Sequence, residues 1–456
     1  MSSYTSRDRF SLASDTLNQW QNATASVLYE RTISEQLFAT ATLAFGRYSY
    51  DVTDDDPATA FDLHYGITYP SLKIDLNRNS LFHNQTFGFQ TTYYVFKPGD
   101  LESRSPESAA VTTHMPAEKA FESAFYFSDN FQYTDRLQIE AGLRLSIFNR
   151  IGPGRVYHYL AEEPLEPQNI IDSTMYGSGD VMKTFVRPEP RLSLNYIIDL
   201  QSSFKLGFNR IYQYVHLITN SATVTPVDIW QLSNTYFQPQ RADQISAGYF
   251  RTSRNHRFEM VVESYYKYQK NILEFKDGAN LILNPQLETD LLSGTGRSYG
   301  AEFSLRKLTG KLQGTLSYSY SRSLRRAAGN ADVEIINDGQ WFPSNADQPH
   351  VVNLSWNFNV TRRVFFTGNF LYHTGRPVSL PSGGYIVNGI VIPDFEARNN
   401  YRIPDYHRLD IAFVIEGSNR KDRKFESSWI FSLYNVYGRK NPYSVFFAHL
   451  GGGVVK

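Results

Sequence analysis

The sequence has no cysteine among its 456 residues, which excludes a disulfide framework, cysteine-ligated zinc, an iron–sulfur cluster and a thiol nucleophile. It also lacks net charge, because 45 Lys and Arg balance 45 Asp and Glu. Without a basic excess, the chain has no electrostatic footprint for nucleic acid, and we expect no nucleic-acid partner. Mean hydropathy is −0.40. No apolar run approaches the roughly 18 residues that a transmembrane helix requires, so that class of membrane protein is excluded.

The chain is rich in the side chains that populate membrane β-strands. It contains 31 Tyr and 32 Phe, and aromatic residues make up 15% of the sequence. A transmembrane β-barrel alternates lipid-facing apolar residues with lumen-facing polar residues, so its mean hydropathy resembles that of a soluble protein. The composition therefore leaves this membrane class open.

The dominant pattern is an alternation with a period of two, in segments of about ten residues, the length of a tilted membrane strand. Clear examples lie at residues 137–147, 191–198, 315–321 and 352–360. Helical spacing is hard to find anywhere in the chain. The polar positions are often charged or amide-bearing, so one face of each strand is wet and the other apolar. The pattern predicts an all-β protein.

The connections between these segments alternate in length. Short ones fall near 33–36, 76–80, 129–135, 199–202, 253–256, 307–311, 360–363 and 417–424, and longer ones near 51–58, 98–116, 151–184, 218–241, 271–297, 325–346 and 376–401. Outer-membrane barrels have short periplasmic turns and long external loops. We therefore expect one domain, an antiparallel transmembrane β-barrel meander of about 17 strands.

A series of short motifs follows in order over more than half of the chain. They are Glu189-Pro190-Arg191-Leu192-Ser193, Lys205-Leu206-Gly207-Phe208-Asn209-Arg210, Gln213-Tyr214, Trp230, Gln238-Pro239-Gln240-Arg241-Ala242, Glu263-Ser264-Tyr265-Tyr266-Lys267, Ser298-Tyr299-Gly300-Ala301-Glu302, Tyr318-Ser319-Tyr320-Ser321, Gln348-Pro349-His350, His407-Arg408-Leu409-Asp410 and Leu433-Tyr434-Asn435-Val436-Tyr437. As a set they resemble the C-terminal barrel of TonB-dependent receptors, the active importers of the outer membrane. The closest resemblance is to the Bacteroidota-type group.

The resemblance implies a function and partners. A chain of this family is expected in the outer membrane of a Gram-negative bacterium, in contact with its lipid. Such a protein imports a scarce large solute, such as an iron-siderophore, cobalamin, an oligosaccharide or a peptide, and is not an enzyme. It implies energy coupling to the TonB complex through a plug domain and TonB box, neither of which is visible in this chain, and a surface lipoprotein as a further candidate partner.

The family barrel has 22 strands, so the resemblance implies that about five are absent here. Residues 1–456 are then expected to form a partial barrel domain that lacks the plug, the first strands and the last strand. Strands at Tyr4–Ala13 and Phe425–Phe447 are both expected to run outward. The start at Met1 has no signal-peptide features, which fits the expectation of a fragment.

Neither metal chemistry nor catalysis has a convincing motif. Asp51 and Asp54-Asp55-Asp56 crowd one predicted outer loop, where the alternatives are a calcium site and a solvated acidic loop, and the weak ligand spacing favours the latter. The ten histidines show no zinc spacing, and there is no nucleophile elbow. We therefore predict neither a catalytic residue, a metal site nor a cofactor.

Two further sets of residues have a structural interpretation. Glu259 and Glu263 lie on one face of a strand, where lumenal charge balanced by nearby Arg and Lys explains them better than a catalytic pair. Gly177-Ser178-Gly179 and Ser293-Gly294-Thr295-Gly296 are predicted to be flexible loop glycines.

Aromatic residues of the long loops are the candidates for binding a ligand by ring stacking. They are Tyr157, Tyr176, Trp230, Tyr236 and Trp341, with Tyr159 and Phe342 beside them. The alternative role is the interfacial girdle, where Tyr and Trp lie at headgroup level. Their position within loops slightly favours ligand or loop packing.

Two other functions are compatible with the sequence. A plugless porin-like channel or a structural outer-membrane surface protein is compatible with the absence of a visible plug. A soluble glycan-binding β protein is a third alternative, but it explains the alternation of short and long connections poorly.

Overall fold

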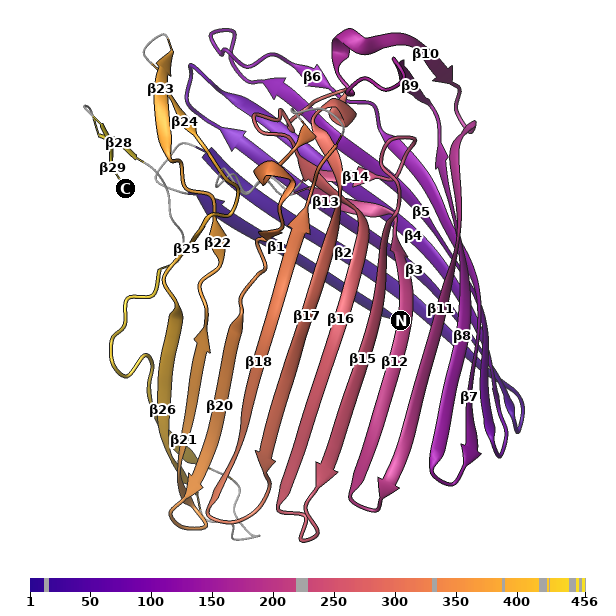
Figure 1. The fold of residues 1–456 in the computed structure, drawn as a ribbon, viewed down its shortest axis with the longest axis vertical. Coiled ribbons are helices and arrows are strands. Elements are labelled where there is room, and N and C mark those ends of the chain that lie inside the picture. Colours follow the sequence, from indigo (N-terminus) through magenta and orange to yellow (C-terminus); the bar gives the residue numbers. More distant parts are fainter. Residues whose placement is uncertain are drawn as a thin grey trace.

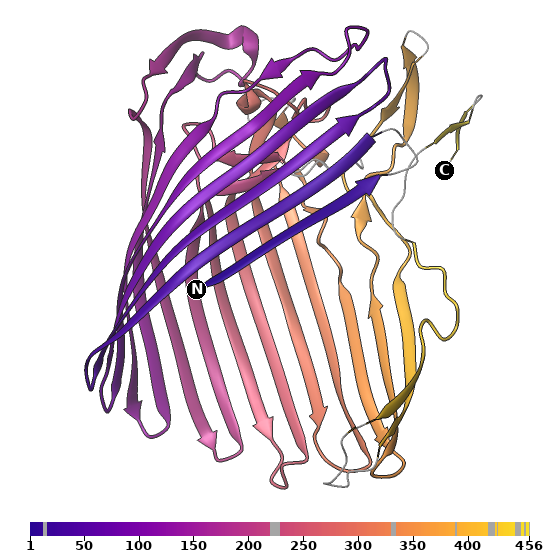
Figure 2. The same cartoon turned by 180° about the vertical axis from the view of Figure 1, so that it is seen from behind.

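The computed structural model describes residues 1–11, 16–218, 229–329, 334–387, 390–417, 425, 427–442, 448–450 and 453–455. Its main feature is one curved antiparallel sheet in which each strand pairs with the next along the chain (Figures 1 and 2). The 17 strands of this meander are β1 (Ser2–Ser11), β2 (Thr16–Ser34), β3 (Leu37–Asp54), β4 (Phe61–Asn79), β5 (His83–Ser103), β7 (Glu118–Thr134), β8 (Leu137–Ile151), β11 (Val181–Asp199), β12 (Ser202–Gln213), β15 (Gln240–Thr252), β16 (Phe258–Phe275), β17 (Leu291–Lys307), β18 (Leu312–Arg326), β20 (His350–Asn359), β21 (Val364–His373), β26 (Tyr406–Glu416) and β27 (Ser428–Leu433). The all-β prediction is confirmed.

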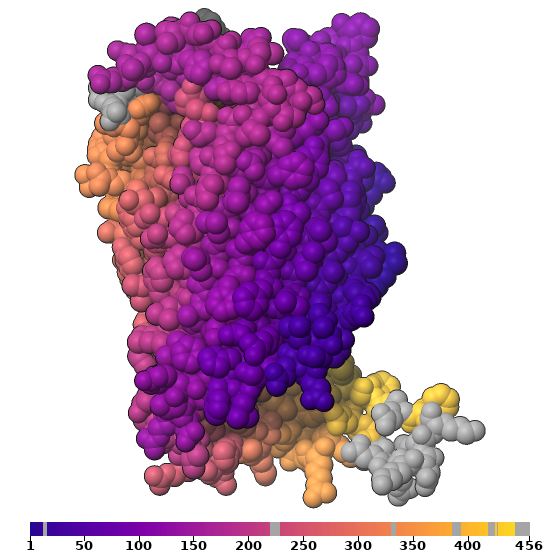
Figure 3. Space-filling view, turned by 90° about the vertical axis from the view of Figure 1, so that its right-hand side faces the viewer, coloured from indigo at the N-terminus to yellow at the C-terminus, as the bar shows by residue number. Residues whose placement is uncertain are grey.

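The two faces of the sheet have opposite character. On β8, Leu143 and Leu145 are 52% and 38% exposed, whereas Ser146 is fully buried and Arg150 is only 8% exposed. Neighbouring strands also expose apolar side chains on one face. Cross-strand aromatic pairs such as Phe87–Phe127 lie on this exposed face, with ring centroids 4.7 Å apart. The space-filling view shows these strands as a continuous outer wall (Figure 3). An apolar outside and a polar inside are the pattern of a membrane barrel wall.

Long and short connections lie at opposite ends of the strands (Figure 1). The long ones contain short elements: β6 (Thr113–His114), β9 (Gly154–Tyr159), η1 (Pro167–Asn169), β10 (Ile170–Tyr176), β13 (Val215–Ile218), β14 (Ile229–Leu232), η2 (Leu287–Thr289), η4 (Asn337–Gly339), β19 (Phe342–Pro343), β22 (Pro377–Val378), β23 (Gly383–Val387), β24 (Ile390–Asp394) and β25 (Tyr401–Arg402). Beyond β27 lie β28 (Ala448–Leu450) and β29 (Gly453–Val455). Within the described ranges, no helix has the length and apolar character needed to cross a membrane.

The structure differs from the sequence-based prediction at one glycine segment and at the last long strand. The glycines of Ser293-Gly294-Thr295-Gly296 are not in a loop but in β17, because the strand begins at Leu291; a Cβ on Gly294 would approach the Arg326 carbonyl oxygen to 2.7 Å. The predicted strand Phe425–Phe447 is too long, since β27 ends at Leu433 and Asn435 has a φ of 53°. Most of the predicted turn 417–424 lies outside the described residues.

Other local features agree with a wet inner face and an apolar outer face. Arg408 and Asp410 form an ion pair of 2.9 Å, and the pairing register places them on the face opposite to that of Leu409. Glu259 pairs with Arg306 at 3.6 Å, as expected for balanced lumenal charge. Gly177 to Gly179 form a turn, in which Gly179 has a φ of 90°.

Candidate functional site

A hairpin from a long connection folds against the inner wall of the barrel. Tyr214, just before β13, is 1% exposed, and its ring stacks on Phe148 of β8 with centroids 4.9 Å apart and planes 2° apart. The Tyr214 hydroxyl also lies 2.7 Å from Ser146 Oγ, and Leu232 of β14 is buried in the same cluster. The apolar contacts and the buried hydrogen bond fix the β13–β14 hairpin at the barrel mouth (Figure 1).

A histidine of this hairpin is neutral by virtue of its burial. His216 is 3% exposed, and its Nε2 lies 2.9 Å from Ser233 Oγ. Burial lowers the pKa of His216 to about 4, because the charged imidazolium is poorly solvated there. The hairpin is therefore assembled around an uncharged imidazole at neutral pH.

Two further loops pack on the other side of the hairpin. Ile218 and Ile229 join Phe275, Leu281 and Leu287, from the end of β16 and the connection to β17, in a second apolar cluster. The Tyr159 hydroxyl of β9 donates to Glu288 Oε1 of η2 at 3.0 Å. The loops that follow β8, β12 and β16 are thereby joined to one another.

The side chain of Asn234 fixes the backbone at Tyr236. The Asn234 side chain accepts hydrogen bonds from the backbone N–H groups of Tyr236 and Phe237, at 2.8 and 2.9 Å, which is an Asx turn. The Tyr236 hydroxyl then donates to the Tyr157 carbonyl oxygen, and its ring meets Tyr159 edge to face at 5.5 Å. Burial raises the pKa of Glu288 and of Tyr159, the latter also because of the nearby carboxyl.

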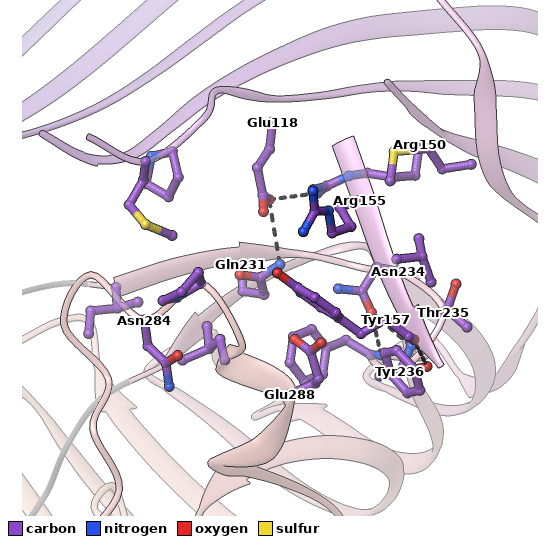
Figure 4. A pocket seen from close by; sticks show the side chains of 18 of the residues that line it. Glu118, Arg150, Arg155, Tyr157, Gln231, Asn234, Thr235, Tyr236, Asn284 and Glu288 are labelled. Atoms are coloured by element: carbon purple, nitrogen blue, oxygen red, sulfur yellow. Dashed lines mark hydrogen bonds and ion pairs between the residues drawn. The ribbon is translucent and has the colours of Figure 1, made fainter. Parts of the chain in front are cut away.

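These three loops, the connection from β5 to β7 and the wall strands line a pocket (Figure 4). It contains about 850 Å³ of atom-free space, part of which is continuous with solvent. Its lining combines aromatic, charged and amide side chains with two methionines: Met115, Glu118, Arg150, Arg155, Tyr157, Met182, Lys183, Trp230, Gln231, Asn234, Thr235, Tyr236, Asn284 and Glu288, together with Pro98, Val156, Ile229, Phe237, Leu281, Leu283, Pro285 and Leu287.

Hydrogen-bond donors at this pocket are incompletely used. Arg150 donates from Nη1 to Glu118 Oε2 at 2.6 Å, and Gln231 approaches the same oxygen at 3.5 Å (Figure 4). Arg150 Nε and Trp230 Nε1 are buried and have no hydrogen-bond partner within the described ranges. Buried polar groups are nearly always satisfied, so these two donors are exceptions to the usual pattern.

The pocket brings together three of the five aromatic residues singled out from the sequence. Tyr157, Trp230 and Tyr236 line it. Tyr176 ends β10 opposite Gly154 in the β9–β10 pairing and is not among the lining residues. Trp341 lies elsewhere, with its ring 4.3 Å from the Arg297 guanidinium carbon.

Sequence reasoning missed the charged members of the pocket. Glu118 and Arg150 belong to wall strands and Glu288 to a short 3₁₀ helix, and none of them stands in a recognisable motif. The periodicity places Glu118 and Arg150 on the inner face, but no local signal shows that they lie opposite the β13–β14 hairpin.

The acidic loop after β3 uses its carboxylates internally. Asp54 accepts hydrogen bonds from the Asp56 backbone N–H at 3.1 Å and from Thr59 Oγ1 at 2.9 Å, and Asp55 pairs with Arg104. Across the described part of the chain, no group of three or more His, Asp or Glu side chains is arranged to hold a metal ion.

The sequence and the fold both resemble those of known proteins. The profile of a family described as TonB dependent receptor-like, beta-barrel, matches residues 2–436. The fold is similar to that of the ferric-catecholate import receptor Fiu from E. coli K12 (13% identity, TM-score 0.58, 94% of this chain and 61% of that chain). It is also similar to the pyoverdine receptor FpvA from Pseudomonas aeruginosa PAO1 (13%, 0.60, 93% and 58%) and to the copper transporter OprC (10%, 0.62, 96% and 68%).

The chain spans about three fifths of the length of the first two solved structures. No curated protein matches it in sequence. At identities of 10–13%, the solved structures establish the shared fold and nothing more. The family profile matches nearly the whole chain and is the evidence for family membership.

Proposed function

The chain belongs to the TonB-dependent receptor β-barrel family, and we propose that it serves the active import of a scarce, bulky solute across a Gram-negative outer membrane. This family consists of transport receptors rather than enzymes. In the proposed orientation the long loops face outward, the short turns face the periplasm, and energy comes from TonB. The Bacteroidota-type affiliation and a surface lipoprotein partner stay predictions that rest on the sequence motifs.

The observation that carries the proposal is the pocket at the loop end of the barrel. Three of the loops that line it are joined by hydrogen bonds and apolar packing, so the site is largely formed before a solute arrives. Preformed concave sites with apolar walls and a few convergent polar groups are typical of ligand binding. The inward β13–β14 hairpin narrows the mouth, which favours gated uptake over an open porin-like channel.

The lining indicates the type of solute. Tyr157, Trp230 and Tyr236 offer ring faces, while Arg150, Arg155 and Lys183 offer charged donors. A solute with both rings and oxygen acceptors satisfies the two sets, as an aromatic iron chelate does. Fiu, FpvA and OprC carry different cargoes by name, so the shared fold does not select one.

The test is solute binding to the purified protein, with ferric chelates, cobalamin and oligosaccharides as the panel. Trp230→Ala should weaken binding of the matching solute at least about tenfold, as for a buried aromatic anchor. Trp341→Ala is the matched control, because Trp341 is also a loop aromatic but lies outside the pocket, and its affinity should stay within about twofold. Equal effects of the two variants, or no binding by any compound, would refute the proposed site. Uptake in cells, which requires a plug domain and TonB box together with this barrel, should disappear when TonB is deleted.

A further inference from the structure

Three neighbouring short turns carry a concentration of positive charge. They join β15 to β16, β17 to β18 and β20 to β21, and we call their charged residues the basic rim. Within residues 251–259, 306–313 and 358–365 there are eight cationic residues and one carboxylate, Glu259. The cations are Arg251, Arg254, Arg257, Arg306, Lys307, Lys311, Arg362 and Arg363.

Four other short turns of the same end lack this excess, whereas residues 417–424, which lie mostly outside the described part of the chain, contain four cationic residues and one acidic residue. Residues 33–38, 78–84, 133–138 and 198–203 contain two cationic residues, Arg78 and Arg136, against the three acidic residues Glu35, Asp135 and Asp199. The net charge of the whole chain is zero, so the basic rim is a local feature of one sector of the barrel.

The basic rim is continuous in space. β16 pairs with β17 and β18 with β20, so the three turns are adjacent at the lower edge in Figure 1. All of its cations are exposed except Lys307, which is half-buried. In the described part of the chain, Arg254, Arg257, Lys311 and Arg362 form no ion pair, whereas Arg306 is 3.6 Å from Glu259 on the lumenal face and Arg363 donates to the Glu416 carbonyl oxygen at 3.0 Å. Four exposed cations without an ion-pair partner give this end of the sheet a positive surface.

A second observation places the basic rim at the membrane boundary. The Lys307 Nζ lies 6.0 Å from the centroid of the Phe258 ring, which belongs to the exposed apolar face of β16 with Val262 and Tyr266. Arg251 approaches the Tyr249 hydroxyl at 3.4 Å. A hollow beside the turns is lined by Arg306, Lys307 and Trp356, among others. Aromatic residues paired with basic ones mark the headgroup level of a membrane protein.

From this geometry we propose that the basic rim binds the phosphate headgroups of anionic phospholipids in the inner leaflet of the outer membrane. Guanidinium groups donate two parallel hydrogen bonds to phosphate oxygens, and basic clusters next to an apolar surface attract anionic lipid. A lipid fits better than a soluble acidic protein, because short turns project little beyond the headgroup level and the cations, apart from Arg306 on the lumenal face, lie in turns at the end of the apolar face. The interaction would anchor one sector of the barrel and is independent of the solute.

The test compares retention of two lipids by the detergent-purified protein in native mass spectrometry. Dioleoylphosphatidylglycerol should be retained in preference to dioleoylphosphatidylcholine, and less so as ionic strength rises. The variant R254Q/R257Q/K311Q/R362Q should lose about fivefold in affinity for each cation removed. R78Q/R136Q, on turns outside the basic rim, is the matched control and should retain the lipid as the parent does.

Folding is checked by heat-modifiable migration in gel electrophoresis. If the fourfold variant fails to fold, the single variant K311Q and the salt dependence of the parent protein test the same proposal. Equal retention of the two lipids by the parent, or equal retention of phosphatidylglycerol by the fourfold variant, would overturn it. Displacement by millimolar inorganic phosphate would instead identify a site for free phosphate, and the lipid assignment would be wrong.

Discussion

At the scale of single residues, Arg398 connects loops that are far apart in sequence. Its side chain is 5% exposed and donates to Glu274 Oε1 at 3.0 Å, to the Phe275 carbonyl oxygen at 2.8 Å and to Asp277 at 2.6 Å. Its guanidinium carbon lies 4.1 Å from the centroid of the Phe275 ring. Arg398 also exchanges two backbone hydrogen bonds with the Asn337 side chain, so one residue ties three connections together.

We expect Arg398→Ala to destabilise the loop end by about 3 kcal/mol. Removing one partner of a buried ion pair costs about 3–5 kcal/mol, and the lower figure applies because Arg325 still pairs with Glu274 at 3.0 Å. Chemical denaturation in detergent, with limited proteolysis of residues 374–405, measures the change. Arg306→Ala, which removes the exposed pair with Glu259, is the control and should cost less than about 1 kcal/mol.

His216 should make the β13–β14 hairpin sensitive to acid. Because the folded pKa of His216 is depressed to about 4, its contribution to stability is complete above about pH 6.5 and is lost as the pH falls towards 4. The full loss amounts to about 3 kcal/mol. Glu288, whose pKa is raised by burial, titrates with the opposite sign, since protonation favours the packed state.

The measurement is amide hydrogen exchange at residues 215–218 and 229–232, corrected for the intrinsic effect of pH. Protection should fall between pH 7 and pH 4.5 in the parent protein and change much less in His216→Gln. Protection that falls equally in both proteins would show that another group controls the hairpin.

At the scale of elements, each long strand is defined by its two faces rather than by a buried core. Leu143 lies near the middle of β8, on the exposed face, and opposite Phe127 of β7. Ser193 of β11 lies on the other face, opposite Glu140. The same substitution should therefore have different consequences on the two faces.

Leu143→Arg should destabilise the folded barrel by about 2–4 kcal/mol in a lipid bilayer, because it places a cation near the midplane. Ser193→Arg adds the same charge to the lumenal face, where water and Glu140 accommodate it, and should change stability by less than about 0.5 kcal/mol. Reversible unfolding in lipid vesicles measures both variants. Equal destabilisation would mean that the assignment of the faces is incorrect.

At the scale of the whole molecule, the alternation of connection lengths gives the sheet two different ends. The loops that follow β8, β12 and β16 build the pocket at one end, and the basic rim lies at the other. In the proposed orientation, the solute site faces the outside and the basic rim the periplasm. The two sites should therefore be accessible from opposite sides of the membrane.

An epitope tag inserted near Ser173, in β10, should be accessible to antibody on intact cells. A tag near Asn255, in the turn between β15 and β16, should become accessible only after the outer membrane is permeabilised. The reverse pattern would invert the topology, and with it the assignment of the basic rim to the inner leaflet.

The sequence by itself determined the strands, their number and the two classes of connection. These features are local: alternation in segments such as 137–147 reports which face of a strand is apolar, and loop length is read directly from the spacing of the segments. Prediction from the local sequence failed where pairing with neighbouring strands outweighs the local composition. The glycines at 293–296 resemble a loop, but pairing with β16 and β18 holds them in β17.

Only the tertiary structure decided which residues meet. Tyr157 and Tyr236 are 79 residues apart and touch because their loops fold over the same part of the barrel mouth. Trp230 joins them because the β13–β14 hairpin turns inward onto Phe148, whereas Trp341, an equally plausible candidate in sequence, packs on Arg297. The direction in which a loop folds depends on contacts with distant strands, and a one-dimensional pattern does not contain that information. The site therefore emerged from packing, while the barrel wall was determined by the alternation of its residues.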